Sequence, residues 1–153
     1  MNQSTQTRAT QLFEESYTRV FGTGIGITPT GEAFFRRFYQ RFFAASPRVP
    51  ELFRQTDMNR QVQMLKKSLY QVVALYITDT IPDHVRKIAE RHHALKIETE
   101  LYDIWLDCLI ETVKEFDDPF DFTTELAWRL ALAPAITYMK FWAGSESAPQ
   151  QGP

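Results

Sequence analysis

The sequence predicts an all-α domain, and three observations support this class. Apolar residues recur every three or four positions in each long segment, which is the spacing of one face of a helix. Glycine, proline and aspartate interrupt these segments where helices are expected to begin or end. No stretch alternates apolar and polar residues as a half-buried strand does. At 153 residues the chain is long enough to bury one sizeable core, so we expect a single domain.

The first two long helices are expected over residues 10–21 and 28–45. Residues 22–26 read Gly-Thr-Gly-Ile-Gly and break the first pattern; they lack the third glycine and the preceding strand of a dinucleotide-binding loop. Thr28 and Pro29 are typical of a helix cap and a first helical residue. The second segment is filled by phenylalanines at helical spacing: Phe34, Phe35, Phe38, Phe42 and Phe43. Ser46 and Pro47 then begin a short segment that ends near Phe53.

Three further long helices are expected after Phe53, with a shorter one between the first two of them. Asp57 can cap the first, whose single apolar or pocket-facing stripe advances in steps of three and four: Met58, Gln61, Leu65, Leu69, Val72 and Tyr76. Residues 80–83 end that helix and open the shorter one, which carries Val85, Ile88, Ala89 and His92 on one side. The others run from 97 to 116 and from 122 to 142, and Pro134 should kink the last one. We expect a domain over residues 1–143 and a disordered polar tail over 144–153.

Composition and charge exclude several classes of protein. With a net charge of −2 and a pI of about 5.9, the chain lacks the excess of positive charge that is typical of nucleic-acid-binding domains. Cys108 is the single cysteine, which excludes an intramolecular disulfide and suits a reducing cytosol. Residues 1–11 are polar, and no run reaches the roughly 18 apolar residues of a membrane span. We therefore expect a soluble cytoplasmic protein that binds neither nucleic acid nor membrane.

Four segments of the chain resemble motifs of bacterial single-domain globins. Residues 38–43 (Phe-Tyr-Gln-Arg-Phe-Phe), followed by Pro47 and Phe53, are similar to the second and third globin helices. Tyr39 precedes Pro47 by eight positions, and Pro47 precedes Phe53 by six. Residues 57–69 resemble the distal helix of these globins, and residues 90–92 with Tyr102 resemble the proximal segment. The resemblance covers residues 34–142.

The resemblance implies a globin fold, in which a helical sandwich encloses one haem b. Neutral imidazole is a good iron ligand, and His92 is the implied axial ligand. Tyr39 and Gln61 are the implied donors to a bound gas, since a phenol and an amide both carry donor hydrogens. The remaining implied pocket residues form its apolar walls or contact the histidine: Phe53, Leu65, Leu69, Ile97 and Tyr102. Taken alone, each residue is more typical of an ordinary core or surface position, and it is their joint spacing that favours a haem pocket.

Other residues carry weaker signals. Arg91 can pair with a haem propionate. The basic pairs at 66–67 and 86–87 are interpreted as solvated faces, and the three tryptophans, at 105, 128 and 142, as core or interface residues. Twelve phenylalanines suit a core that also encloses a flat apolar cofactor. Because the distal face carries glutamine and not histidine, we expect the reduced iron to be open on that side.

The chain departs from the globins that act as nitric oxide dioxygenases. In these, the proximal histidine contacts a tyrosine and a glutamate of the last helix, which strengthens its electron donation. Tyr102 is at the matching offset, but no acid lies between Glu125 and Glu146. The chain also carries no reductase domain or flavin motif, so turnover would require electrons from a separate protein.

These observations favour reversible binding of O2, CO and NO, for oxygen storage, delivery or scavenging. Two alternatives stay open. One is a nitric oxide dioxygenase that works with a separate reductase, and the other is a gas sensor or haem-free module that acts through a partner. The sequence leaves open whether the protein is a monomer or a homodimer.

Overall fold

Seven helices make up the parts of the chain that the structure, a computed structural model, describes. These parts are residues 3–24, 26–78 and 80–147, with side chains described except at residues 3, 72–77 and 143–147. They contain no strand, so the predicted all-α class is confirmed. The helices are α1 (Gln3–Phe21), α2 (Pro29–Ala45), α3 (Arg48–Leu52), α4 (Met58–Thr78), α5 (Asp83–Ala94), α6 (Thr99–Phe116) and α7 (Phe122–Ser147). None of the helices in these parts is both long and apolar enough to cross a bilayer.

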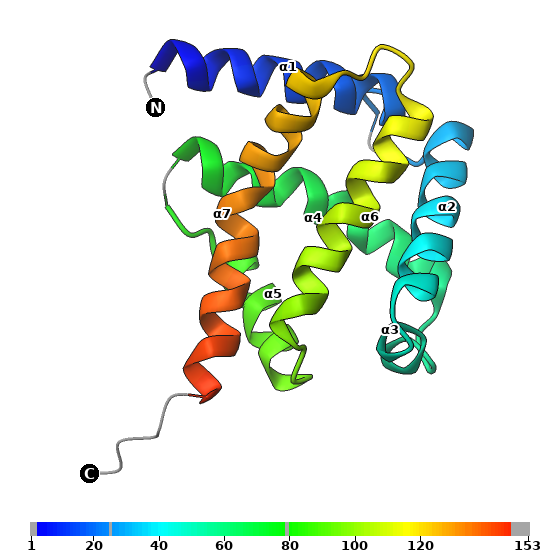
Figure 1. Cartoon of the computed structure of the whole chain (residues 1–153), viewed down its shortest axis with the longest axis vertical. Helices are drawn as coiled ribbons and strands as arrows, with labels where there is room; N and C mark the ends of the chain where they lie inside the picture. Colours follow the sequence, from blue (N-terminus) through cyan, green and yellow to red (C-terminus); the bar gives the residue numbers. More distant parts are fainter. Residues whose placement is uncertain (1–2, 25, 79, 148–153) are drawn as a thin grey trace.

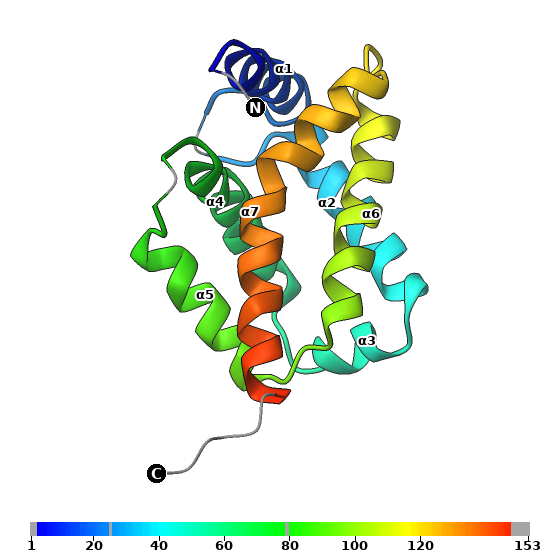
Figure 2. The same ribbon diagram turned by 60° about the vertical axis from the view of Figure 1, so that its left-hand side comes forward.

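The last helix, α7, lies at the centre of the packing. It contacts α1, α4, α5 and α6, while α2 packs against α6. Figure 1 shows α6 and α7 in front of α4, which crosses behind them, and α1 lying across one end. Figure 2 shows α5 beside the lower half of α7. The space enclosed by α2, α4, α5, α6 and α7 is where the candidate site lies.

Helix α1 begins seven residues before the predicted start at Thr10. The prediction was wrong because residues 4–8 are polar and Ala9 is the first buried residue described in the helix, so no apolar repeat marks the exposed first turns. The helix ends at Phe21 and is followed by Gly22, whose φ of 75° is left-handed and favours glycine. The Gly22 amide donates to the Thr18 carbonyl at 2.8 Å, which satisfies a helix-end carbonyl.

Helix α2 begins as predicted. The Thr28 hydroxyl accepts from the Gly31 amide at 3.0 Å, and Pro29 is the first helical residue. Phe34, Phe35 and Phe38 are fully buried. The rings of Phe34 and Phe35 are in edge-to-face contact, and Phe35 also stacks on Phe21 of α1 with 5.3 Å between ring centroids. Phe38 meets Trp105 of α6 edge to face. These aromatic contacts fix α2 as one wall of the enclosed space.

A buried polar network holds α1 against the corner between α6 and α7. The Trp128 indole donates to the Ser16 hydroxyl at 2.8 Å, and that hydroxyl donates to the Asp117 carboxylate at 2.6 Å. Arg19 donates to both oxygens of the same carboxylate. Asp117 is 1% exposed, so its charge is compensated by these partners rather than by water. The predicted core position of Trp128 is confirmed.

The prediction that Lys66 and Lys67 both face solvent is right for Lys67 and wrong for Lys66. Lys67 is exposed, but Lys66 is 6% exposed and its Nζ donates to the Gly24 carbonyl at 3.0 Å and to the Gly26 carbonyl at 2.6 Å. The glycine-rich connection between α1 and α2 has folded over α4 and supplies these acceptors. A lysine that can reach backbone carbonyls is buried at low cost, which no pattern within α4 could reveal.

The ends of α4 and α7 are set by short-range features. The Asp57 carboxylate accepts from the amides of Asn59 and Arg60, at 3.0 and 3.3 Å, as predicted for a cap of α4. Of the predicted α4 stripe, the side chains of Val72 and Tyr76 lie outside the described residues. Helix α7 continues through Pro134 and bends along its length (Figure 2). It extends to Ser147, so residues 144–147 are helical, and the rest of the predicted tail, residues 148–153, lies outside the described residues.

Candidate haem pocket

A single apolar cavity brings together the site residues that the sequence suggested. Its volume is about 290 Å³ and its surface is mainly aliphatic and aromatic. The eight candidate site residues all line it: Tyr39, Phe53, Gln61, Leu65, Leu69, His92, Ile97 and Tyr102. They come from α2, α4, α5, α6 and the connections beside them, so only the folded chain assembles them. An apolar cavity with a few polar groups is typical of a cofactor site.

The ring of His92 is held in a fixed orientation. His92 lies in the last turn of α5, and its Nδ1 is 2.8 Å from the Ile88 carbonyl oxygen, one turn earlier. Because a carbonyl can only accept, Nδ1 carries the hydrogen and Nε2 keeps a lone pair. Burial lowers the pKa of His92 below its usual value, and the charge of Arg91 also lowers it. A neutral imidazole of fixed tautomer is the form that binds a metal.

The chain reverses after the end of α5 and returns to the cavity. Lys96 has a φ of 57°, a left-handed conformation that is uncommon for a residue with a side chain. The reversal places the Ile97 amide 3.4 Å from the His92 carbonyl, and Ile97 lines the cavity. Tyr102, from the first turns of α6, lies beside the histidine with 6.2 Å between ring centroids. Burial raises the pKa of Tyr102 to about 12, so its phenol stays protonated at neutral pH.

Tyr39 and Gln61 are the two distal candidates, and both line the same cavity. Tyr39 comes from α2 and is 7% exposed, and burial raises its pKa to about 12. The Gln61 side chain opposes that rise. Because its pKa is about 12, the Tyr39 phenol keeps its hydrogen at neutral pH. A phenol and an amide, both with donor hydrogens, thus line an otherwise apolar space.

Phe53 is fixed by other aromatic rings rather than by a regular helix. It lies just after the short α3, and its ring centroid is 5.8 Å from that of Tyr39, 6.4 Å from Phe42 and 5.7 Å from Phe43. Tilted and edge-on contacts at these distances are favourable. The α2 phenylalanine repeat therefore orients both Tyr39 and Phe53 at the cavity.

Comparison with known proteins decides the family. The family model described as Globin matches residues 36–139, which is more than half of the chain. The chain belongs to the globin family. The predicted resemblance to globins is therefore confirmed. Membership of this family implies a haem cofactor and small gas ligands.

Solved structures and curated relatives agree with the globin fold. A Pseudomonas aeruginosa protein, described as structurally highly homologous to human hemoglobin, superposes with a TM-score of 0.76 and 31% identity, over 88% of this globin and 98% of that chain. Flavohemoproteins of Vibrio cholerae and Halalkalibacterium halodurans are 30% and 36% identical over 107 residues, or 66% of this globin. The chain spans only about a quarter of the length of those two relatives, 27% and 26%.

Several lining residues of this globin escaped the sequence analysis. Trp105, which the sequence analysis interpreted as a core or interface residue, lines the cavity together with Leu101. The two residues are four positions apart and share one face of α6, and this spacing was the sequence signal that could have placed Trp105 in the pocket. Met64 is 39% exposed and also lines the cavity, so it lies at the opening. Arg91 lines the cavity as well, and its pairing with a propionate stays a prediction. The other unpredicted members are Phe42, Leu52, Thr56, Ser68, Ile88, Leu95, Leu101, Leu132, Ala135, Ile136 and Met139.

The histidine side of the pocket is apolar where α7 contributes to it. Ile136 and Met139 line the cavity, and Met139 packs with Ala89 and Tyr102 in a small cluster. Among the described residues that line the cavity, none is aspartate or glutamate. Helix α7 does carry one acid beyond Glu125, Glu146, but its side chain lies outside the described residues. The described lining therefore supplies no carboxylate from any helix.

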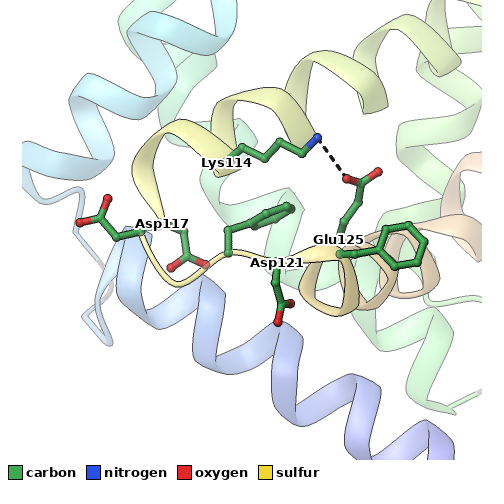
Figure 3. A pocket seen from close by; sticks show the side chains of 7 residues that line it. Lys114, Asp117, Asp121 and Glu125 are labelled. Carbon is green, nitrogen blue, oxygen red and sulfur yellow. Dashed lines mark ion pairs between the residues drawn. The ribbon is translucent and has the colours of Figure 1, made fainter.

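A second hollow, at the corner between α6 and α7, has a different character. Figure 3 shows Lys114, Asp117, Asp121 and Glu125 around it, with Lys114 paired to Glu125 at 3.2 Å. Asp117 is engaged in the network with Ser16 and Arg19. These charges already have partners within the fold, so we assign the hollow no ligand.

Proposed function

We propose that this globin reversibly binds O2, CO and NO on a haem b held by His92, for oxygen storage, delivery or scavenging. The observation that carries the proposal is the Nδ1 contact of His92 with the Ile88 carbonyl, in a cavity that Tyr39 and Gln61 also line. We also propose a cytoplasmic location, where the free thiol of Cys108 would stay reduced.

His92 supplies the protein ligand in this proposal. Its hydrogen is committed to the Ile88 carbonyl, so Nε2 is the ring atom left for iron. The lowered pKa keeps the imidazole neutral at neutral pH. A ferrous haem supplies the iron atom that binds a diatomic gas.

Tyr39 and Gln61 stabilise the gas ligand in this proposal. Bound oxygen carries partial negative charge, and the Tyr39 phenol stays a donor because its pKa is about 12. One such hydrogen bond contributes on the order of 1 kcal/mol, which slows oxygen release about fivefold. The low dielectric of the apolar cavity strengthens this bond relative to water.

The walls exclude water and shape the space. Leu69 is 1% exposed, and Phe53, Leu65 and Ile97 are partly buried members of the main core cluster. Side chains of this kind surround a flat apolar ring system without leaving polar groups unpaired. Exclusion of water is also expected to slow oxidation of ferrous iron.

Nitric oxide dioxygenation with a separate reductase is the second candidate. The relatives named flavohemoproteins support it, although this chain spans about a quarter of their length. We rank it below oxygen binding because Ile136 and Met139 make the α7 wall near His92 apolar, where a carboxylate would strengthen electron donation.

Visible spectra test the proposal. We expect a Soret band in the purified protein, a shift of that band after dithionite and carbon monoxide, and an oxygenated form that lasts many minutes in air. A protein without a Soret band after haem supplementation would be a haem-free module. Rapid loss of nitric oxide by the oxygenated protein, with recovery in cell extract, would favour the dioxygenase. Two sharp visible bands in the reduced protein without gas would contradict the open distal side.

A further inference from the structure

Basic residues concentrate in the segment that forms the mouth of the cavity. Residues 54–96 hold eight of the 17 lysines and arginines but only four of the 19 acids. Residues 97–153 hold three lysines and arginines and eleven acids. A chain with a net charge of −2 is therefore divided into a basic part and a strongly acidic part. The acidic corner between α6 and α7 lies at the opposite end of the molecule from the C-terminal end of α5 (Figures 1 and 2).

Helix α4 presents one cationic stripe beside the mouth. Arg60, Met64 and Lys67 are spaced by four and three positions, so they share one face of the helix. All three are exposed, and Met64 lines the cavity. The two cations therefore flank a residue at the opening.

Helix α5 presents a second stripe of the same kind. Lys87, Arg91 and Leu95 are spaced by four positions and are exposed, with Leu95 following the last residue of the helix. Arg91 and Leu95 line the cavity, and Leu95 is 55% exposed. We call these six residues of α4 and α5 the mouth surface.

The charges of the mouth surface are not neutralised within the described parts of the fold. The neighbouring Arg86 is paired with Asp83 and Glu90, at 3.3 and 3.0 Å. By contrast, the four cations of the mouth surface form no ion pair with any described residue. Arg91 has a predicted partner in a haem propionate, whereas Arg60, Lys67 and Lys87 have no ion-pair partner among the described residues. An apolar centre beside such cations has the anatomy of a transient protein interface.

We propose that the mouth surface docks an acidic protein that donates single electrons, such as an acidic iron–sulfur protein. This inference rests on the proposed function, since it assumes a haem in the cavity behind Met64 and Arg91. The transfer balances as one electron lost by the reduced partner and one gained by ferric iron, which becomes ferrous, with no bond made or broken. Opposite charges steer the encounter and raise its rate constant.

Stopped-flow reduction of the ferric, haem-loaded protein by a reduced acidic [2Fe–2S] ferredoxin tests the docking. At about 20 mM salt, the double variant Arg60→Glu, Lys67→Glu should lower the second-order rate constant about tenfold or more. At about 500 mM salt the difference should disappear, because the Debye length falls to a few ångströms. The control is Arg8→Glu, Arg36→Glu, which makes the same charge change at exposed positions of α1 and α2 and should lower the rate constant far less, because only the net charge acts there.

Binding is measured separately from electron transfer. We expect oxidised ferredoxin to shift amide resonances of residues 60–67 and 87–95 in the diamagnetic carbon monoxide form of the protein. Equal loss of rate in both double variants, an unchanged rate constant, or shifts confined to other helices would each overturn the proposal. So would binding of the mouth surface to phosphatidylglycerol vesicles without any binding of ferredoxin.

Different measurements would contradict the proposed function and the proposed docking surface. Haem content and oxygen dissociation are measured first on every preparation, and the double variant should match the wild type in both. A wild-type protein that binds no haem would contradict the proposed function itself. A wild-type protein that binds haem and oxygen, yet reacts with ferredoxin independently of salt, would overturn only the docking surface.

Discussion

The Nδ1 atom of His92 lies 2.8 Å from the carbonyl oxygen of Ile88, four residues earlier in α5. The neighbouring His93 has its ring against Trp142, with 5.7 Å between centroids. Two consecutive histidines on one helix point about 100° apart, so they meet different surroundings. His92 lines the cavity, and His93 is not among the residues that line it.

Replacement of these two histidines should therefore have different results. His92→Gly should abolish or gravely weaken haem retention, because the iron loses its protein ligand, and added imidazole should restore the Soret band. His93→Gly is the matched control and should retain the wild-type haem content. Equal haem loss in the two variants, as measured by absorbance per protein, would argue against ligation by His92.

The Tyr39 phenol is expected to slow oxygen release. Tyr39→Phe removes one hydrogen bond of about 1 kcal/mol, so the oxygen dissociation rate measured by stopped flow should rise about fivefold or more. Tyr138→Phe is the control, since Tyr138 packs beside Trp142 and does not line the cavity. An unchanged dissociation rate in Tyr39→Phe would remove Tyr39 from the site.

We expect Tyr102 to have little effect on the strength of the bond between His92 and the iron. It lies beside His92, but the described cavity residues supply no carboxylate to form a three-residue network with it. Tyr102→Phe should therefore leave the iron–histidine stretching frequency in resonance Raman spectra, and the oxygen dissociation rate, close to wild type, within about twofold for the rate. A large drop in that frequency would indicate a strong proximal network.

Haem retention should resist mild acid. Burial favours neutral His92 and lowers its pKa, so the folded protein takes up this proton only below the usual value of 6.5. The contribution of His92 to stability is complete above pH 6.5 and is lost as the pH falls through the lowered pKa. Haem transfer to an acceptor globin should accelerate only below pH 6.5, and a midpoint at or above pH 6.5 would contradict the assignment.

We expect the buried side chain of Lys66, unlike the exposed one of Lys67, to contribute to the free energy of unfolding. Lys66→Met removes both hydrogen bonds to the Gly24 and Gly26 carbonyls, so the free energy of unfolding in urea should fall by about 1–3 kcal/mol. Lys67→Met at the adjacent exposed position should change it by no more than about 0.5 kcal/mol. Similar values for the two variants would show that the buried amine contributes nothing.

Local sequence signals predicted most of the fold correctly. The Thr28 and Asp57 caps lie where the residue types placed them, because capping is decided within three or four residues. The apolar stripes of α2 and α5, and the described part of the α4 stripe, also face the core or the cavity, since helical periodicity alone fixes which residues share a face. The same periodicity missed the first turns of α1, where a polar, exposed helix has no stripe to detect.

The sequence by itself determined that this chain forms amphipathic helices of these approximate lengths and that His92, Gln61 and Tyr39 lie on their inward faces. The tertiary structure alone decided that these faces enclose one cavity, and that Lys66 reaches carbonyl groups 40 and 42 residues away. The physical reason is the range of the interactions. Caps and stripes depend on neighbours along the helix, whereas the cavity and the partners of Lys66 depend on how separate helices pack.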